Sequence, residues 1–325
     1  MNKEFWNNKK VLLTGHTGFK GSWLSLWLQK LNANVIGFSK SVPTNPSLFE
    51  LADIESGMIS IMGNVCDYDK LEEAIKEHEP EIVIHMAAQA ILRESYHNPI
   101  ETYATNVMGT VNLLESTRKV GSVRVILNVT TDKCYEPNDS LEGHLETDRL
   151  GGYDPYSNSK ACSELVTSSF RNSFFNPKEY KKHGVSLATC RAGNVIGGGD
   201  WGKDRLIPDI MRGILNNETI KIRNPNSTRP WQHVLDPLNG YLSLAEKSWS
   251  SGAEFSEGWN FGPLESDEKP VRWIVEKLTR QWSDNIKWDI DNSVNLHEEN
   301  YLRLDCLKAS SRLGWTPKLS LEQGL

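Results

Sequence analysis

The chain lacks the features of a membrane, secreted or nucleic-acid-binding protein. None of its apolar stretches is long enough to span a bilayer, and its polar N-terminus, Met1 to Lys10, has no signal-peptide core. It also lacks a tract of Lys and Arg, and its net charge of −6 argues against a surface for nucleic acid. These absences predict a cytoplasmic protein that binds neither nucleic acid nor membrane.

Cysteine is scarce and scattered. The five cysteines form no CxxC pair and no cluster with histidine: Cys66, Cys134, Cys162, Cys190 and Cys306. Structural zinc sites and disulfide frameworks have recurring cysteine spacings that this chain does not show. The sequence therefore predicts neither a disulfide framework nor a metal site.

Short apolar runs alternate with amphipathic stretches through the first half of the chain. The runs that predict strands are 11–14, 35–38, 59–62, 82–86, 123–129 and 185–189. The stretches that predict helices are 18–31, 68–77, 99–119 and 155–174. Several runs are continuously aliphatic, as strands of a parallel sheet covered on both faces require. This pattern predicts an α/β protein with a Rossmann-type, doubly wound parallel sheet.

The alternation ends after about Arg191. Three glycines at 197–199 and several later prolines interrupt short elements, which predicts a smaller, irregular lobe at the carboxyl ends of the strands. We expect residues 1–190, with part of 234–263, to form a dinucleotide-binding domain and residues 191–325 to form mainly a substrate-binding lobe. Residues 321–325 resemble the start of a helix, which predicts that the chain continues beyond them.

A glycine-rich loop joins the first predicted strand to the first predicted helix. Its glycines allow a tight turn and a close approach of backbone to a pyrophosphate, which the free N–H groups of the helix N-terminus favour. Because the loop follows a strand and opens a helix, it predicts a dinucleotide cofactor. The candidate contacts in it are Gly15, Thr17, Gly18, Phe19, Lys20 and Gly21.

The position that distinguishes NAD from NADP is ambiguous. An acidic residue is expected after the second strand, where this chain has Phe38, Ser39 and Lys40. Ser39 suits a ribose hydroxyl and Lys40 tolerates a 2′-phosphate, so the residues leave both cofactors open. After the fourth strand, small residues leave clearance for a cofactor, and a polar helix residue is placed to brace them: Ala87, Ala88, Gln89 and Asn106.

A tyrosine and a lysine share one face of a predicted helix. Asp154 and Pro155 suit its N-cap and first position, and Tyr156 and Lys160 follow at a spacing of four. Lowering a tyrosine pKa from ~10 to ~7 takes about 4 kcal/mol of phenolate stabilisation, which an ammonium and a positive nicotinamide can supply. The same spacing also occurs by chance on solvated helices.

Polar side chains follow the strand predicted at 123–129. Thr131, Asp132 and Lys133 lie at the carboxyl edge of the sheet, where they are well placed for chemistry, although a solvated loop start has the same composition.

Together, these motifs resemble the extended short-chain dehydrogenase/reductase family, over nearly the whole chain. The surroundings of Asp132 resemble its sugar-nucleotide 4,6-dehydratases, which have Thr-Asp-Glu where this chain has Thr-Asp-Lys. The segments 14–23, 43–49, 131–135, 191–201 and 229–238 are similar to the branch that acts on CDP-glucose.

The resemblance implies an NAD-dependent dehydration of the hexose. Tyr156 would take the O4 proton while C4 is oxidised, Lys160 would support it, and Thr131 would bond O4. Asp132 would protonate the hydroxyl that leaves C6. Lys133 stands where relatives have the base for C5, so it acts either as a free amine or only as a stabilising charge beside another base.

Further contacts come from the same resemblance. Arg229 suits the diphosphate, whereas Arg205 is equally compatible with a surface ion pair; Asn64 and Val65 match positions that hold the adenine. The candidate substrate contacts are Gln89, Arg93, Asn194, Arg205 and Arg229.

The family also implies a homodimer through a four-helix bundle of the helices at 99–119 and 155–174, and products that enter bacterial surface polysaccharide. Two other functions remain open: a sugar-nucleotide 4-epimerase, which needs Tyr156 and Lys160 but no acid for C6, and a non-catalytic dinucleotide sensor.

Overall fold

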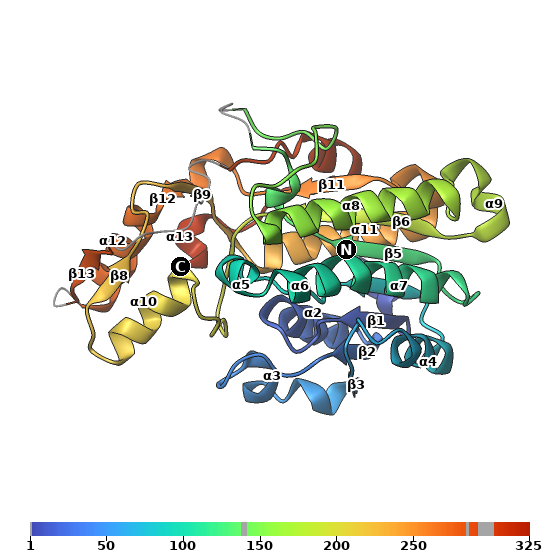
Figure 1. The fold of residues 1–325 in the computed structure, drawn as a ribbon, viewed down its shortest axis with the longest axis horizontal. Coiled ribbons are helices and arrows are strands. Elements are labelled where there is room, and N and C mark those ends of the chain that lie inside the picture. Colours follow the sequence, from blue (N-terminus) through green and yellow to red (C-terminus); the bar gives the residue numbers. More distant parts are fainter. Residues whose placement is uncertain (1, 138–141, 284–285, 292–301) are drawn as a thin grey trace.

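A seven-stranded, wholly parallel sheet forms the centre of the computed structural model, which describes residues 2–137, 142–283, 286–291 and 302–325 (Figure 1). Its strand order is β11-β6-β5-β4-β1-β2-β3. The strands are β1 (Lys10–Thr14), β2 (Asn34–Ser39), β3 (Ile59–Met62), β4 (Ile82–His85), β5 (Val125–Val129), β6 (Ser186–Ala192) and β11 (Gly258–Phe261). The order reverses beside β1, so the carboxyl ends of β1 and β4 flank the crevice in which such sheets bind ligands.

Helices cover both faces of the sheet, because successive residues of a strand point to opposite sides. Leu13 of β1 packs with Leu28 and Tyr241, so α2 (Phe19–Lys30) and α11 (Leu235–Ser251) cover one face. Leu12 packs with Leu71 and Leu113 on the other face, under α4 (Tyr68–His78), α7 (Gly109–Arg118) and α8 (Pro155–Ser173). The core therefore consists of two apolar layers with the sheet between them.

The predicted strands and helices of the first half are confirmed, and the fold differs from the prediction in several places. The helix predicted at 99–119 is divided into α6 (Pro99–Tyr103), a π-helical turn at Ala104–Met108, and α7. The N-terminus forms the short helix α1 (Lys3–Trp6) before β1, because its buried Trp6 packs into the core. The seventh strand, β11, was not predicted; it pairs with β6 and brings the chain back to the sheet after α11.

Three further short helices precede Arg191: α3 (Leu48–Leu51), α5 (Leu92–His97) and α9 (Tyr180–His183), the last at the right end of the view in Figure 1. The other remaining elements follow Arg191 and are short, as predicted from the glycines and prolines there. They gather at the left end of the view, around a separate apolar cluster that contains Ile210, Trp231 and Ile274. Their helices are α10 (Leu206–Leu215), α12 (Val271–Trp282) and α13 (Leu321–Gly324). The strand pairs are β7 (Val195–Ile196) with β10 (Gln232–His233), β8 (Ile220–Ile222) with β13 (Trp288–Ile290), and β9 (Thr228–Pro230) with β12 (Glu268–Pro270).

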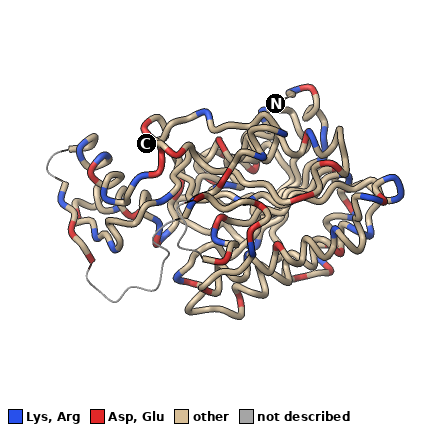
Figure 2. The backbone as a smooth tube through the Cα atoms, turned by 90° about the horizontal axis from the view of Figure 1, so that it is seen from above, with Lys and Arg blue, Asp and Glu red and all other residues tan. Residues whose placement is uncertain are grey.

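Charge is distributed evenly over the fold. Basic and acidic residues alternate along the tube in Figure 2, without a large region of one sign in that view. Within the described residues, no helix is both long enough and apolar enough to cross a membrane. The five cysteines are all free thiols.

A buried histidine fixes the glycine-rich loop to the second strand. The ring of His16 bonds Ser39 Oγ through Nδ1 and Ser60 Oγ through Nε2, both at 2.9 Å. It occupies the space over Gly37, where a Cβ atom would lie 2.4 Å from the ring. Burial lowers the pKa of His16 to about 4, so the ring is neutral at physiological pH.

This histidine makes the free energy of unfolding depend on pH. The unfolded chain binds a proton at His16 below about pH 6.5, whereas the folded chain binds it only near pH 4. The stabilisation is therefore complete above pH 6.5 and is lost as the pH falls toward 4, by on the order of 3 kcal/mol. We expect His16→Gln to flatten the curve of unfolding free energy, measured in urea, over this window. His78→Gln, on the surface of α4, is the control; equal slopes in wild type and His16→Gln would contradict the assignment.

Candidate active site

The glycine-rich loop leaves the N-terminus of α2 open to an anion. Gly15 has a φ of +76°, and a Cβ on Gly21 would lie 2.0 Å from the Gly15 carbonyl oxygen, so the turn requires both glycines. Gly18 is the N-cap, and no side chain caps the helix. The first amides of a helix have no acceptor within it, so those of Phe19, Lys20 and Gly21 suit a pyrophosphate.

The other predicted cofactor residues near β2 and β3 make contacts within the protein, and two of them, Thr17 and Ser39, hold the glycine-rich loop in place. Thr17 Oγ1 donates to the Ser41 carbonyl at 2.7 Å, and the Ser39 hydroxyl is buried against His16. Lys40 pairs with Glu101 at 2.7 Å on the surface. Asn64 accepts from the Cys66 amide at 3.0 Å, while Val65 is buried in the core under α7.

Asn106 connects the turn after β4 to the helix that carries Tyr156. Its Oδ1 accepts from the Gln89 amide at 2.9 Å, and its Nδ2 donates to the Gln89 carbonyl and to Ser159 Oγ. The Gln89 side chain bonds Ile91 and Thr102. Through these bonds Asn106 holds the half-buried turn of Ala87 and Ala88 against α8.

Tyr156 lies in the first turn of α8, which Asp154 caps by accepting from the Ser157 amide at 3.0 Å. Burial raises the pKa of Tyr156 to about 12, and a hydrogen bond from Thr131 opposes the rise. Reaching a pKa near 7 from there requires on the order of 7 kcal/mol of phenolate stabilisation. The tyrosine therefore needs further positive charge beside it before it can serve as a base.

Lys160 points back from α8 to the end of β5. Its Nζ donates to the Val129 carbonyl at 3.1 Å, and its side chain is buried. Burial, together with the charge of Lys20, lowers the pKa of Lys160 to about 8, whereas Glu164 opposes the shift. The ammonium is thus held at the strand end, close to losing its proton at physiological pH.

Asp132 is a buried carboxyl group at the same strand end. Its Oδ1 accepts from Thr131 Oγ1 at 3.0 Å, and its Oδ2 has no hydrogen-bond partner in the described part of the chain. Burial raises its pKa, against the opposing charges of Lys133, Arg229 and Lys20. A buried carboxyl with a raised pKa and a free oxygen suits a general acid.

Cations surround Asp132 from three directions, and the sequence indicated only part of this arrangement. Lys133 follows it in the chain and is half-buried, and Arg229 approaches from β9. Lys20, predicted as a cofactor contact, extends from α2, and its Nζ lies 3.5 Å from the hydroxyl of buried Tyr241 on α11. Burial lowers the pKa of Lys20 to about 8. Tyr241 was not predicted, because its position beside the site depends on the return of α11 to the sheet.

The predicted substrate arginines lie on both sides of the site. Arg205 pairs with Asp200 at 3.1 Å, yet its charge also acts on Tyr156 and Lys20, so it is both an ion-pair and a site residue. Arg93 of α5 lies 3.8 Å from Asp204, which also pairs with Arg223 of the second lobe at 3.4 Å.

The other two predicted substrate residues come from the chain that follows β6 and from β9. Arg229 is buried, and its Nη1 donates to the Thr228 carbonyl at 3.1 Å. Asn194 lies just before β7, where its backbone carbonyl accepts from Gln232 at 3.1 Å.

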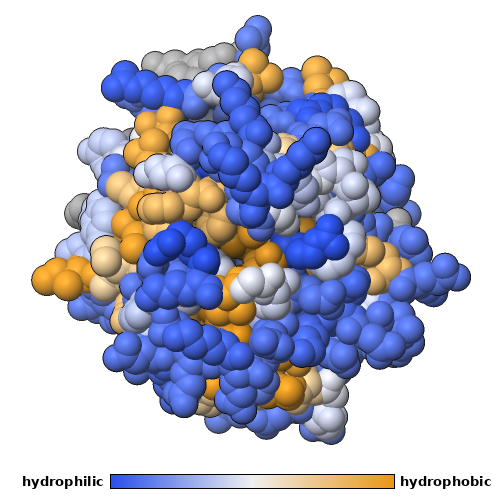
Figure 3. All heavy atoms as spheres, turned by 90° about the vertical axis from the view of Figure 1, so that its right-hand side faces the viewer, coloured by the Kyte–Doolittle hydropathy of each residue, from blue (hydrophilic) through white to orange (hydrophobic). Residues whose placement is uncertain are grey.

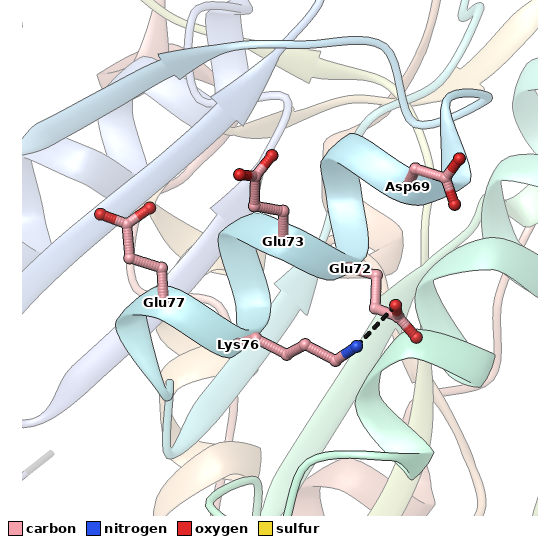
Figure 4. A pocket seen from close by; sticks show the side chains of 5 residues that line it. All are labelled: Asp69, Glu72, Glu73, Lys76 and Glu77. Carbon is pink, nitrogen blue, oxygen red and sulfur yellow. Dashed lines mark hydrogen bonds and ion pairs between the residues drawn. The ribbon is translucent and has the colours of Figure 1, made fainter.

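A separate hollow lies on the outer surface of α4. Asp69, Glu72, Glu73 and Glu77 project from this helix together with Lys76, which pairs with Glu72 at 2.7 Å (Figure 4). None of the predicted site residues lines it. Across the described residues, His, Cys, Asp and Glu side chains form no group that suits a metal ion.

Removing the charge of Lys20 should raise the pKa of Lys160, because Lys20 is the charged neighbour that disfavours its protonation. We expect the midpoint of the Lys160 titration to move up from about 8 in Lys20→Met, measured by NMR of protein labelled at lysine Cε and assigned with Lys160→Met. The exposed Lys40→Met is the matched control. An unchanged midpoint in Lys20→Met would show that the two ammonium groups do not interact.

Comparison with known proteins agrees with this geometry. The family model for GDP-mannose 4,6 dehydratase matches residues 12–325. The CDP-glucose 4,6-dehydratase of Salmonella typhimurium is 55% identical over 325 residues, which cover 100% of this chain and 90% of that protein.

Solved structures share the fold at lower identity. The dTDP-glucose 4,6-dehydratase of Bacillus anthracis in complex with NAD has a TM-score of 0.79 at 22% identity, covering 97% of this chain and 94% of that one. The UDP-glucose 4-epimerase of Thermotoga maritima with UDP-glucose has a TM-score of 0.80 at 23% identity, covering 97% and 95%. The family model and the Salmonella relative confirm the resemblance seen in the sequence motifs, and the chain therefore belongs to the GDP-mannose 4,6 dehydratase family of nucleotide-sugar enzymes.

Proposed function

We propose that the protein converts CDP-glucose to CDP-4-keto-6-deoxyglucose, with NAD as a cofactor that is regenerated in each turnover. The observation that carries the proposal is the buried Asp132 carboxyl beside Tyr156 and Thr131, because a 4-epimerase needs no acid for C6. The 55% identity to the Salmonella enzyme over the whole chain supports CDP-glucose as the substrate.

The chain has a suitable cradle for the cofactor. The uncapped α2 N-terminus and the tight turn that Gly15 and Gly21 permit suit the pyrophosphate. When bound, NAD would supply the redox chemistry, which is acceptance of a hydride from C4 of the hexose and its return to C6. Lys40 is engaged by Glu101, so it offers no free cation for a 2′-phosphate, which favours NAD over NADP. The charge of Lys20 interacts with that of Asp132 and with that of Lys160, so both lysines lie near the proposed reacting groups.

Tyr156 acts as the base at O4 in this proposal. Its phenolate takes the O4 proton, and Thr131 hydrogen-bonds the same oxygen. Lys160, whose ammonium is held by the Val129 carbonyl, supplies positive charge beside the phenolate. The cofactor's positive ring provides stabilisation that the chain alone does not, since burial otherwise holds the pKa of Tyr156 at about 12.

Asp132 acts as the acid for elimination. Oxidation at C4 acidifies the C5–H bond, so a base, either Lys133 as a free amine or another group beside it, takes the C5 proton while Asp132 protonates the departing C6 hydroxyl. The same base returns that proton to C5 when hydride is returned to C6. The raised pKa of the Asp132 carboxyl favours the protonated form that the elimination needs. In its protonated form, Lys133 adds positive charge beside Asp132, where the enolate develops.

Arginines of the two lobes bind the nucleotide. Arg229 and Arg205 supply cations near the reacting groups, and Arg93 and Arg223 lie further out around Asp204. Guanidinium groups match phosphate oxygens in pairs, so we assign the diphosphate to this group. Gln89 and Asn194 complete the predicted substrate contacts.

The test is a product assay by mass spectrometry with NAD and four substrates: CDP-glucose, dTDP-glucose, UDP-glucose and GDP-mannose. We expect CDP-glucose alone to lose one water. In Asp132→Asn, which keeps the shape of the side chain but has no acidic proton, dehydration should fall by about 10²–10⁴-fold. Oxidation at C4 should persist, so dihydronicotinamide absorbance should rise and remain high.

Each other result has a defined meaning. Loss of water from another nucleotide sugar only would retain the dehydration and reject CDP. No loss of water from any substrate would reject a 4,6-dehydratase and favour epimerisation at C4. An Asp132→Asn variant that dehydrates at the wild-type rate would remove Asp132 from the mechanism.

We propose further that the protein is a homodimer formed by α6, α7 and α8 of two copies. Apolar side chains of these helices and of the π-helical turn between α6 and α7 face solvent, including Ile100 at 85% exposure, Met108 at 52% and Leu165 at 57%. Leu114 instead packs into the core. Figure 3 shows the molecule from the right-hand end of Figure 1, and the larger apolar areas lie at and to the left of its centre. Apolar area of this kind favours a protein interface.

Light scattering tests the dimer. We expect twice the 36.7 kDa chain mass for wild type and the mass of one chain for Leu165→Asp, because a buried unpaired carboxylate opposes association. Leu215→Asp changes an equally exposed leucine on α10 and should remain dimeric. A monomeric wild type would reject the interface.

The proposed reaction also suggests where the enzyme acts and what its product supplies. We place the enzyme in the cytoplasm, and its 4-keto-6-deoxy product in the supply of deoxy sugars for bacterial surface polysaccharide such as the O-antigen of lipopolysaccharide.

A further inference from the structure

A buried ion pair lies one helical turn beyond Lys160. Glu164 of α8 accepts from Nη2 of Arg191 on β6 at 2.8 Å, and the two side chains are only 3% and 6% exposed. Burial alone would raise the pKa of Glu164, but the charge and hydrogen bond of Arg191 hold it below its usual value. Glu164 is therefore a negative charge inside the protein. Nothing in the proposed reaction uses it directly.

Hydrogen bonds from three elements converge on this pair. Thr130, at the end of β5, donates to Glu164 Oε1 at 2.5 Å, and Thr189 of β6 donates to Oε2 at 2.8 Å. Arg191 Nη1 donates to Tyr135 Oη at 2.8 Å and to the Glu146 carbonyl at 3.0 Å. The pair thus joins α8 to the ends of β5 and β6 and to the segment after the Thr131–Lys133 turn.

The same strand end holds Lys160. The Val129 carbonyl, which accepts from Lys160 Nζ at 3.1 Å, belongs to the residue before Thr130. Glu164 and Lys160 therefore fasten one face of α8 to Val129, the last residue of β5, and to Thr130, which follows it. Through this attachment Tyr156 on α8 is placed against Thr131 on the strand-end turn.

The charges that face Lys160 come from several elements. Lys20 of α2 is positive, His85 of β4 is neutral because burial lowers its pKa to about 3, and burial raises the pKa of the Cys134 thiol. Tyr156 lies one turn before it on α8. Glu164 is the group among these that is negative at neutral pH, and it favours the ammonium form of Lys160.

We propose that Glu164 is a positioning residue of the active site, which keeps Lys160 charged and fastens the helix of Tyr156 to the turn of Thr131 and Asp132. Arg191 supports it by holding its carboxylate ionised. The inference deepens the proposed reaction and rests on it for the kinetic test, but the charge of Lys160 can be measured without substrate.

The decisive variant is Glu164→Gln, which keeps the shape and removes the charge. The midpoint of the Lys160 titration, read by NMR of lysine Cε without cofactor or substrate, should fall by on the order of one pH unit. The basic limb of kcat/KM for CDP-glucose should move to lower pH by a similar amount, because Lys160 loses its proton earlier. Glu164→Asp keeps the charge and should leave both near their wild-type positions.

Two controls separate charge from fold. Thr189→Val removes a hydrogen bond to Glu164 but no charge, so the Lys160 midpoint should not move. If Glu164→Gln fails to fold because Arg191 is left unpaired, Glu164→Gln/Arg191→Met removes both charges. The Lys160 midpoint should then fall by less than in the single variant, because loss of the more distant Arg191 cation partly offsets loss of the Glu164 anion.

The outcomes are distinct. A Lys160 midpoint that is unchanged in Glu164→Gln would overturn the inference, as would an unchanged midpoint in the double variant where Glu164→Gln does not fold. A wild type inactive on CDP-glucose, with a shifted midpoint in Glu164→Gln, would instead reject the proposed reaction and retain the role of Glu164.

Discussion

Burial of ionisable groups at the carboxyl ends of β1, β5 and β6 is the constraint on which the site depends. Removing water raises the pKa of Tyr156 and Asp132 and lowers those of Lys20 and Lys160. Each neutral form is therefore favoured, and small changes in nearby charge alter which groups carry protons. A reaction that moves protons and a hydride in sequence needs groups whose protonated and deprotonated forms are close in free energy.

The pairing of buried positive and negative charges also explains why several lysines and arginines occupy one small region. Isolated buried cations would simply lose their protons or oppose folding. Here Asp132 offsets Lys20 whenever its carboxyl is ionised, and Glu164 offsets Lys160 and Arg191, so positive charge is retained where a phenolate and an enolate are proposed to form. The cost of burying these groups is offset by hydrogen bonds to strand-end backbone, such as that from Lys160 to Val129.

The same sheet supports more than one reaction among similar proteins. The Bacillus dehydratase and the Thermotoga epimerase match this fold about equally well, with TM-scores of 0.79 and 0.80. Fold therefore does not distinguish the two activities, and the difference must lie in side chains at the strand ends. The proposed dehydration rests on Asp132, which has a raised pKa and an oxygen without a hydrogen-bond partner among the described residues.

Local patterns in the sequence determined most of the first half of the fold. Aliphatic runs and the helix starts at Gly18 and Asp154 have short-range causes, so β1 to β6 and the main helices could be predicted. The spacing of Tyr156 and Lys160 is likewise a property of one helix.

Only the tertiary structure decided what surrounds these residues. Lys20 and Tyr241 meet near Asp132 because α11 and β11 return to the sheet, and Arg191 meets Glu164 because β6 lies beside β5. Such contacts join residues far apart in the chain, so no local pattern encodes them. The pKa values depend on them as well, since burial and neighbouring charge exist only once the chain has folded.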